Sequence, residues 1–327
     1  MIMKNWTQQL NHDPFKSRLA STADPAIKYF FETDITGDPS LGKEVVWGSR
    51  QVQSILNKQR KDGSWKYPSS KSRAFPKLDY DLYETTTVLA NLVEIYGLNN
   101  SHPAIQLAAE YLFSNQSTQG DIRHIYANQY SPNYSAMIAE LLIKAGYKND
   151  TRVIKILDWL LANRQQDGGW ALPFRTQGFN LRSFDLDKTI EADFSKASSA
   201  MITGVVLRAM AIHPEFKNRN EIKIAAGILA DSLFTADKYP DRKSKDYWTR
   251  FGYPFMYTDL VSALDSLSLV GGFEKHPNTQ KALAWLKERQ TDDGLFDLRI
   301  TRGNRINQEM WMSIAVYRVF KRFYTQH

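Results

Sequence analysis

The 327-residue chain contains no cysteine, which excludes disulfide bridges and metal sites built on thiolates. It also lacks any apolar run close to the roughly 18 to 20 residues that a membrane-spanning helix requires. Its first residues, MIMKNWTQQLNHDPF, contain no apolar core of a signal peptide. The sequence therefore predicts a protein without a transmembrane segment, and a cytoplasmic location is expected.

Acidic residues are outnumbered, since 42 Lys and Arg against 35 Asp and Glu give a net charge of +7. Ordinary solubility accounts for such a charge. A sharper interpretation is attraction to an acidic ligand, an anionic polymer or a phosphate-bearing lipid surface. The basic residues are dispersed along the chain and form no known nucleic-acid module, so we expect no nucleic-acid partner.

What the chain does contain is a recurring phrase ending in glycine and, usually, an aromatic residue. Its copies are QRKDGSW at 59–65, a weaker QSTQGDI at 116–122, RQQDGGW at 164–170 and QTDDGLF at 290–296. The last two glycines are 126 positions apart (294 − 168), twice a unit of about 63, so a degenerate copy is expected at 231–239. A phrase that returns at such distances predicts a repeat protein.

Each copy follows an amphipathic helical pattern, and the glycine suits the end of that helix. A second kind of helix comes after each joint, with small and apolar residues on nearly every side, which indicates burial all round. Exposed and buried helices therefore alternate. We predict one all-α domain spanning residues 1–327, an α/α toroid in which about five to six helical hairpins form two concentric rings.

The predicted helices follow from these two patterns. The exposed helices are expected at 46–59, 103–115, 150–163, 220–234 and 278–290. The buried helices are expected at 83–97, 132–146, 197–211, 256–270 and 307–323. Residues 24–31, DPAIKYFF, begin with the Asp-Pro pair that suits a helix start and are a candidate sixth buried helix.

The phrases QRKDGSW, QQDGGW and QTDDGLF resemble the QW-type motif of the prenyltransferase and squalene oxidase repeat family. That family includes squalene-hopene and oxidosqualene cyclases, class II diterpene cyclases and the β-subunits of protein prenyltransferases. The resemblance extends from about Val46 to the C-terminus. It implies a toroid with an aromatic central cavity that binds or processes an isoprenoid. Because the motif builds helix joints, it implies the fold more strongly than any one reaction.

Two features of that family are missing. Class II cyclases protonate an alkene with a D-x-D-D run, and the nearest sequences here, Asp79-Tyr-Asp81 and Asp185-Leu-Asp187, do not match it. Prenyltransferase β-subunits hold zinc with Asp, Cys and His, and this chain has no Cys. No two of its six histidines have metal-ligand helical spacing, so we expect neither a metal nor a cofactor.

Three carboxylates begin buried helices. Glu84 and Asp259 occupy equivalent positions, each five residues before a leucine, and Glu309 lies near the same level. If they face one cavity, they could act as general acid and base or bind a cation. The alternative is that each caps its helix and complements the helix dipole.

Loops from the joints to the buried helices should all emerge at one end of the toroid, where function usually resides. Their content is aromatic and basic. The candidate substrate-binding residues are Asp81, Tyr83, His124, Arg175, Trp248, Arg250, Tyr257 and Trp311.

Three functions remain open at this point. The first is an isoprenoid-related enzyme or binder that contacts a hydrophobic small molecule with its aromatic cavity. The second is a carbohydrate-active enzyme, similar to toroidal polysaccharide lyases and hydrolases, in which the aromatic rings stack on a sugar ligand. The third is a non-catalytic protein-interaction repeat protein, whose cavity would be filled by side chains.

Overall fold

The computed structural model describes residues 6–19, 22, 24–73, 75, 78, 80–126, 128–180, 188–239, 244–301 and 305–325, without the side chains of residues 305 and 306. Three of the aspartates that were compared with the D-x-D-D motif, Asp79, Asp185 and Asp187, lie outside these residues.

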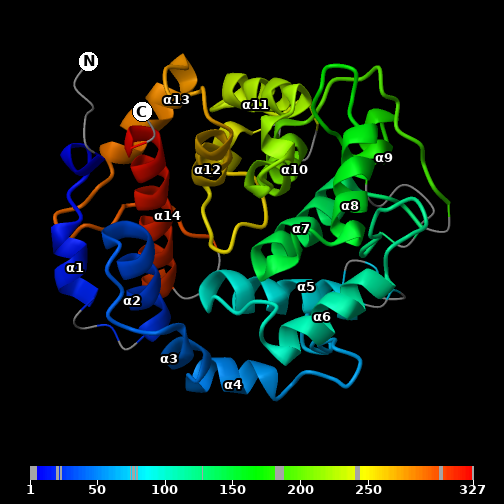
Figure 1. Ribbon diagram of the computed structural model, residues 1–327. Helices are drawn as coiled ribbons and strands as arrows, with labels where there is room; N and C mark the ends of the chain where they lie inside the picture. The colour runs from blue at the N-terminus through cyan, green and yellow to red at the C-terminus, as the bar shows by residue number, and fades with distance from the viewer. Residues whose placement is uncertain are drawn as a thin grey trace.

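Two concentric rings of helices build the molecule (Figure 1). The inner ring consists of α2 (Pro25–Phe31), α5 (Asp81–Ala90), α7 (Pro132–Leu142), α10 (Ala200–Ile212), α12 (Leu260–Val270) and α14 (Arg305–Thr325). The outer ring consists of α1 (Asp13–Leu19), α3 (Lys43–Trp47), α4 (Arg50–Leu56), α6 (Pro103–Ser114), α8 (Thr151–Ala162), α11 (Asn220–Ser232) and α13 (Pro277–Lys287). Only isolated β-bridges occur among the described residues, so the predicted all-α toroid is confirmed.

Short helical segments accompany these rings. Three inner helices, α2, α5 and α7, continue into single π-helical turns at Glu32–Thr36, Asn91–Ile95 and Ile143–Tyr147. The remaining short elements are α9 (Pro173–Thr176) and the 3₁₀ turns Trp6–Gln8, Phe216–Asn218 and Lys245–Thr249.

The N-terminal hairpin differs from the expectation by one helix. The sequence predicts α2, and its Asp24 side chain accepts a hydrogen bond from the Ala26 amide at 3.0 Å. It does not predict α1, which is only seven residues long. The predicted helix at 46–59 is divided into α3 and α4, because Ser49 caps a new helix at the Val52 amide.

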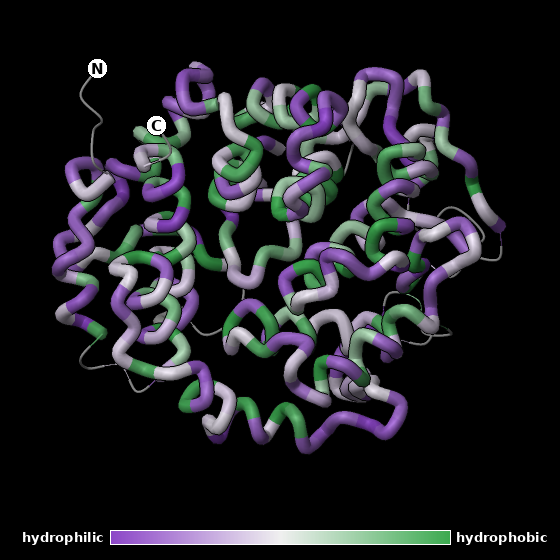
Figure 2. The backbone as a smooth tube through the Cα atoms, viewed as in Figure 1, coloured by the Kyte–Doolittle hydropathy of each residue, from purple (hydrophilic) through white to green (hydrophobic). Residues whose placement is uncertain are grey.

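Burial follows the division into rings. Every residue of α10 from Ala200 to Ala211 is buried, and this helix contacts both of its inner neighbours, α7 and α12. In α4, hydrophobic and hydrophilic residues alternate along the helix, with only Val52 fully buried (Figure 2). The helices that are apolar all round thus surround the centre of the molecule.

The four glycines of the repeated phrase all have a left-handed backbone, with φ between 78° and 116°. The first three lie against the next outer helix in the chain: Gly63 against Leu107, Gly120 against Lys155 and Gly168 against Ile224. Gly294 lies against Phe15 of α1, and the Gln290 amide donates to the Asn11 carbonyl at 2.7 Å. The last joint therefore packs on the first helix and closes the ring.

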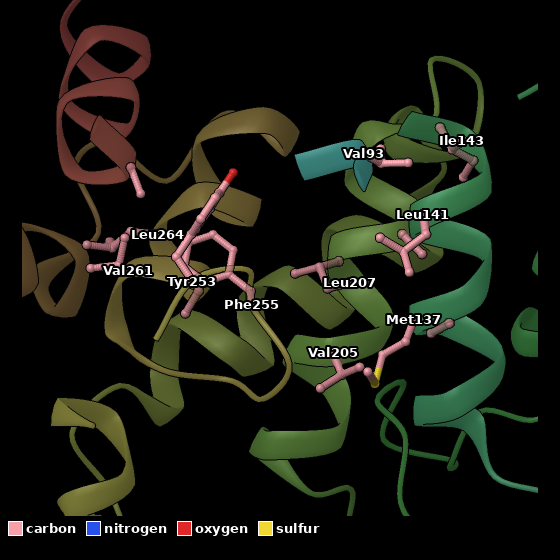
Figure 3. Packing of buried hydrophobic residues seen from close by; sticks show 14 of the residues in the cluster. Val93, Met137, Leu141, Ile143, Val205, Leu207, Tyr253, Phe255, Val261 and Leu264 are labelled. Atoms are coloured by element: carbon pink, nitrogen blue, oxygen red, sulfur yellow. The ribbon is translucent and has the colours of Figure 1, made fainter. Parts of the chain in front are cut away.

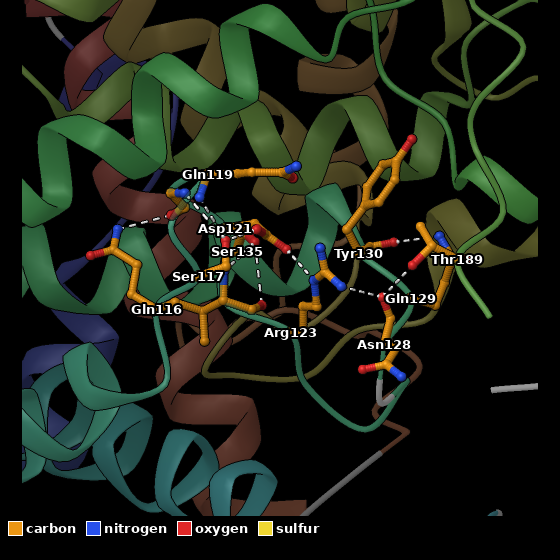
Figure 4. A network of polar contacts seen from close by, with 12 residues as sticks. Gln116, Ser117, Gln119, Asp121, Arg123, Asn128, Gln129, Tyr130, Ser135 and Thr189 are labelled. Carbon is orange, nitrogen blue, oxygen red and sulfur yellow. Dashed lines mark hydrogen bonds and ion pairs between the residues drawn. The ribbon is translucent and has the colours of Figure 1, made fainter. Parts of the chain in front are cut away.

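The glutamines of the phrase bond backbone carbonyls on both sides of the joint. Figure 4 shows Gln116 at the second joint. Its Nε2 donates to the Gly120 carbonyl and to the Arg152 carbonyl of α8, each at 2.9 Å. Gln59 repeats this pattern with the carbonyls of Gly63 and Ala104. In the third joint the equivalent position is Arg164, four residues before Gly168.

The tryptophans of the joints cap the preceding outer helices. Trp65 Nε1 donates to the Ile55 carbonyl at 2.9 Å, and Trp170 Nε1 donates to the Leu160 carbonyl at 2.7 Å. In the degenerate joint, Phe234 has the left-handed conformation (φ 64°), and Trp248 from further along the chain donates to the Thr235 carbonyl. The phrase is thus a helix joint, with its glycine fixed by backbone geometry.

Replacing Gly63 with alanine is expected to destabilise the protein by about 2 to 4 kcal/mol, because strain at positive φ adds to a backbone clash. A Cβ at this position would lie 2.2 Å from the Leu107 carbonyl oxygen. Gly37 provides the matched control, since its φ is 80° and nothing lies within 4 Å of an added Cβ. Gly37→Ala should cost only about 1 kcal/mol in urea denaturation. Equal losses of stability in the two variants would show that the close contact between Gly63 and Leu107 does not contribute to the stability of the fold.

Candidate functional site

A cavity of about 660 Å³ lies inside the inner ring. Helices α5, α7 and α14 contribute to its wall, together with the π-turn after α5 and the loop before α12. The lining residues are Lys71, Tyr83, Thr86, Thr87, Ala90, Asn91, Glu94, His124, Met137, Glu140, Leu141, Tyr253, Pro254, Phe255, Met256 and Gln308.

The cavity is elongated along α5. Six of its lining residues lie on this helix and its π-turn, from Tyr83 to Glu94. Eleven residues of helix correspond to about 16 Å at a rise of 1.5 Å per residue. One end of the cavity carries Tyr83 and His124, and the other carries Glu94 and Glu140.

An apolar wall runs along part of the cavity. It combines Met137 and Leu141 of α7 with Tyr253, Phe255 and Met256 of the loop before α12. Figure 3 shows the rings of Tyr253 and Phe255 beside α12, between that helix and α7, which carries Met137 and Leu141. This wall suits contact with a hydrocarbon rather than with a polar ligand.

The loop that carries the two rings is firmly held. Gln308 forms a reciprocal pair with the Tyr253 main chain, in which its Oε1 accepts from the amide and its Nε2 donates to the carbonyl, both at 2.7 Å. The Tyr253 ring stacks on Trp311 at 5.6 Å, with 10° between the planes. Arg208 Nη2 donates to the Phe255 carbonyl at 3.2 Å. Contacts from α14 and α10 therefore hold this part of the wall in place.

A group of four charged residues, three of them buried, lies at the far end of the cavity. Lys144 Nζ is 2.9 Å from Glu94 Oε2 and 2.7 Å from Glu140 Oε1. Glu140 Oε2 in turn accepts from Arg208 Nε at 3.0 Å. The side chains of Glu94, Glu140 and Arg208 are each no more than 4 % exposed. We call these four residues the charge cluster.

The two carboxyl groups of the charge cluster differ electrostatically. Burial raises the pKa of Glu94, and Lys144 offsets only part of this effect. Burial would also raise the pKa of Glu140, but the positive charges of Arg208 and Lys144 outweigh it and lower that pKa. Where two neighbouring carboxyl groups have pKa values shifted in opposite directions, the one with the raised pKa usually acts as the acid and the other stays charged. Of the two carboxyl groups that line this end of the cavity, Glu94 is therefore the one whose protonated form is favoured by burial.

Tyrosines and one histidine surround the other end. The His124 ring stacks on Tyr134 at 4.2 Å and meets the Tyr83 ring edge-on at 5.4 Å. His124 Nε2 is 3.3 Å from the Thr86 hydroxyl. Burial lowers the pKa of His124 to about 3, so this ring is neutral at physiological pH. It can exchange a hydrogen bond with a ligand but carries no charge.

The lowered pKa of His124 predicts a loss of stability in acid. A histidine whose pKa is about 3 when folded and about 6.5 when unfolded binds its proton mainly in the unfolded chain. Stability should therefore fall as the pH decreases from about 6.5 towards 3. Urea denaturation across this range should show a smaller acid-dependent loss in His124→Phe than in the parent protein. Parallel pH profiles for the two proteins would contradict this assignment.

The three carboxylates predicted as catalytic lie apart from the charge cluster. Glu84 accepts from Lys71 Nζ at 2.9 Å, near the end of the cavity that holds Tyr83. Asp259 caps α12, where its side chain accepts from the Ser262 amide at 2.8 Å in a capping box. Glu309 lies in the first turns of α14, directly after the cavity residue Gln308. None of the three is among the described residues that line the cavity.

The predicted substrate-binding residues divide into two groups. Tyr83 and His124 line the cavity. Asp81 instead pairs with Arg60 at 2.6 Å, and Trp248 and Trp311 are at most 2 % exposed in the core. Arg175 of α9 donates to the Phe179 carbonyl just after that helix, while Arg250 and Tyr257 are exposed.

The charge cluster was missed by the sequence analysis. The sequence does contain one indication of the cluster, since Arg208 is the single charged residue of helix α10. A fully buried arginine needs a carboxylate partner, which implies an acid on a neighbouring inner helix. Nothing in the sequence identifies that partner as Glu140.

Metal-binding groups and membrane-spanning helices also bear on the kind of site. Within the described ranges, no group of three or more His, Cys, Asp or Glu residues is arranged to hold a metal ion. In the same part of the chain, no helix has both the length and the apolar character required to cross a membrane.

No protein-family model matches the chain, and no curated protein matches it. Among solved structures, a protein from Actinoplanes is similar to 91 % of this chain over 88 % of its own, with 14 % identity and a TM-score of 0.48. Type II terpene cyclase MstE from Scytonema is similar to 93 % of this chain. A variant of MstE bound to its substrate geranylgeranyl dihydroxybenzoate has 12 % identity, 87 % coverage of its own chain and a TM-score of 0.48. Ligand-free MstE has 14 % identity, 88 % coverage and a TM-score of 0.47.

Proposed function

We propose that this protein binds an elongated, largely apolar small molecule of the isoprenoid type in its central cavity, and that Glu94 donates a proton to that ligand. The observation that carries the proposal is the cavity itself, which places a buried carboxyl group with a raised pKa at the end of an apolar wall. The dimensions support a chain-like ligand, since the cavity follows α5 for about 16 Å.

The chemistry assigned to Glu94 is general acid catalysis. Its protonated carboxyl group would give its proton to a double bond or an oxygen of the ligand and would become a carboxylate. Lys144 lies 2.9 Å from that carboxylate and would stabilise the new negative charge. Glu140 and Arg208 would hold Lys144 in place without reacting.

Two observations weigh against the other functions that the sequence left open. The rings of Trp248 and Trp311 are packed in the core and offer no stacking surface for a sugar. The centre of the ring is a cavity rather than a plug of side chains, which favours a small-molecule ligand over a purely structural repeat.

The proposal is tested by incubating the protein with squalene, geranylgeraniol, farnesyl diphosphate and geranylgeranyl diphosphate, followed by mass spectrometry of the extract. We expect the parent protein to bind at least one of these prenyl compounds and to convert it. Glu94→Gln should bind the same compound, because the amide keeps the shape of the cavity, but conversion should fall by at least about 100-fold.

Glu84→Gln is the matched control, since Glu84 is a carboxylate on α5 that pairs with the lining residue Lys71 but does not itself line the cavity. It should retain conversion. Equal losses in Glu84→Gln and Glu94→Gln would contradict the role of Glu94. The absence of binding to all four compounds would contradict the ligand class.

A further inference from the structure

We propose that a second pocket, at the C-terminal end of α14, binds a phosphate group. This pocket has a volume of about 430 Å³ and opens to solvent, and it is lined by Asp34, Arg318, Lys321, Arg322 and Thr325. The three basic residues follow the spacing i, i+3 and i+4, so they share one face of the helix. The proposal does not depend on the ligand of the central cavity.

Positive charge exceeds negative charge in this pocket. Arg318 Nε donates to Asp34 Oδ2 at 2.8 Å, and Arg322 pairs with Asp265 of α12. Lys321 Nζ instead donates to two backbone carbonyls, those of Asp34 at 2.7 Å and Ile35 at 3.2 Å. Among the described residues, no carboxylate pairs with Lys321. Among the residues that the structure describes, Asp34 in the pocket and Asp265 beside it therefore pair with two of the three cations, and the charge of Lys321 is left for an anion.

The dipole of α14 accounts for only part of this cluster. Cations are favourable in the last turn of a helix, and only Arg322 lies there. Arg318 and Lys321 lie further back. Of the inner helices that contact α14, α12 has no basic residue in its last turn and α2 has one, Lys28. The positions of Arg318 and Lys321 are therefore not explained by helix capping.

The side chains present fit a phosphate group better than a single carboxylate. Guanidinium and ammonium groups together supply many donors at different angles, and phosphate offers several acceptor oxygens and up to two negative charges. Arg318 also donates to the Tyr253 hydroxyl at 3.0 Å, so the pocket lies directly behind one wall of the central cavity. Either a free phosphate compound or a lipid headgroup would supply the same chemistry.

The test measures binding of inorganic phosphate and inorganic diphosphate by calorimetry, and of phosphatidylcholine vesicles containing phosphatidic acid by flotation. Lys321→Gln is the informative variant. Lys223→Gln is its control, because Lys223 is an exposed lysine of α11 whose loss changes the net charge equally. Lys321→Arg should keep the charge and the site.

We expect diphosphate to bind the parent protein, and Lys321→Gln to weaken that binding about tenfold, as befits a charge-assisted hydrogen bond. Lys223→Gln and Lys321→Arg should bind nearly as the parent does. If vesicles bind with the same pattern while the free anions do not, the phosphate comes from a lipid headgroup. Equal weakening by Lys321→Gln and Lys223→Gln, or no binding of any of the three probes, would overturn the proposal.

Discussion

Replacing Arg208 with methionine is expected to destabilise the folded protein by about 3 to 5 kcal/mol, the typical cost of breaking a buried ion pair by removing one partner. Arg208 is 2 % exposed and supplies one of the two cations that hold Glu140. Without it, the Glu140 carboxylate keeps only Lys144, which it shares with Glu94. The change also removes the donor to the Phe255 carbonyl, which anchors the cavity wall.

Urea denaturation at neutral pH measures this loss. The combined variant Arg208→Met with Glu140→Gln should recover a large part of the stability, because the second change removes the buried carboxylate that has lost one of its two cations. Surface changes such as Lys223→Met should stay within about 0.5 kcal/mol of the parent. An Arg208→Met variant as stable as that surface variant would show that the charge cluster does not exist as described.

Replacing Ala90 with tryptophan is expected to abolish binding of the prenyl ligand while leaving the fold intact. Ala90 lines the cavity on α5, between Tyr83 at one end and Glu94 at the other. An indole at this position would occupy the space that the ligand chain needs. We expect the affinity for geranylgeraniol to fall by at least about tenfold, since a steric block of this kind removes most contacts with the wall.

Titration calorimetry with geranylgeraniol measures this effect, and the compound carries no phosphate that the second pocket could bind. Ala90→Ser is the control, because it changes the polarity slightly but not the available space. It should bind nearly as the parent does. If Ala90→Trp binds geranylgeraniol as tightly as Ala90→Ser, the ligand does not enter this cavity.

The joints could be predicted from the sequence because their causes are local. Gly63 and Gly294 do not end the helices as expected, since each lies seven residues after the last residue of α4 or α13. Each instead gives the turn of the joint its left-handed residue, and the surrounding Gln and Trp side chains bond carbonyls on adjacent segments. A local requirement of this kind imposes the same residues at each repeat. The ring of hairpins follows from the repetition, to which the structure adds the short helices α1 and α9 and the division of the helix predicted at 46–59 into α3 and α4.

The charge cluster could not be predicted in this way because its contacts are not local. Glu94 and Lys144 are 50 residues apart, and Glu140 and Arg208 are 68 residues apart. Their meeting depends on which turns of neighbouring inner helices face each other. Glu84 and Asp259, by contrast, were predicted as site residues because both lie at helix starts. The helix dipole and capping alone favour an acid at such positions.

The most direct test of the account is a crystal structure of the protein with bound geranylgeraniol. We expect the hydrocarbon chain to lie along α5 against Tyr253 and Phe255, with one end within reach of the Glu94 carboxyl group. A ligand bound outside the inner ring, or a cavity that stays free of it under conditions where calorimetry detects binding, would contradict the account.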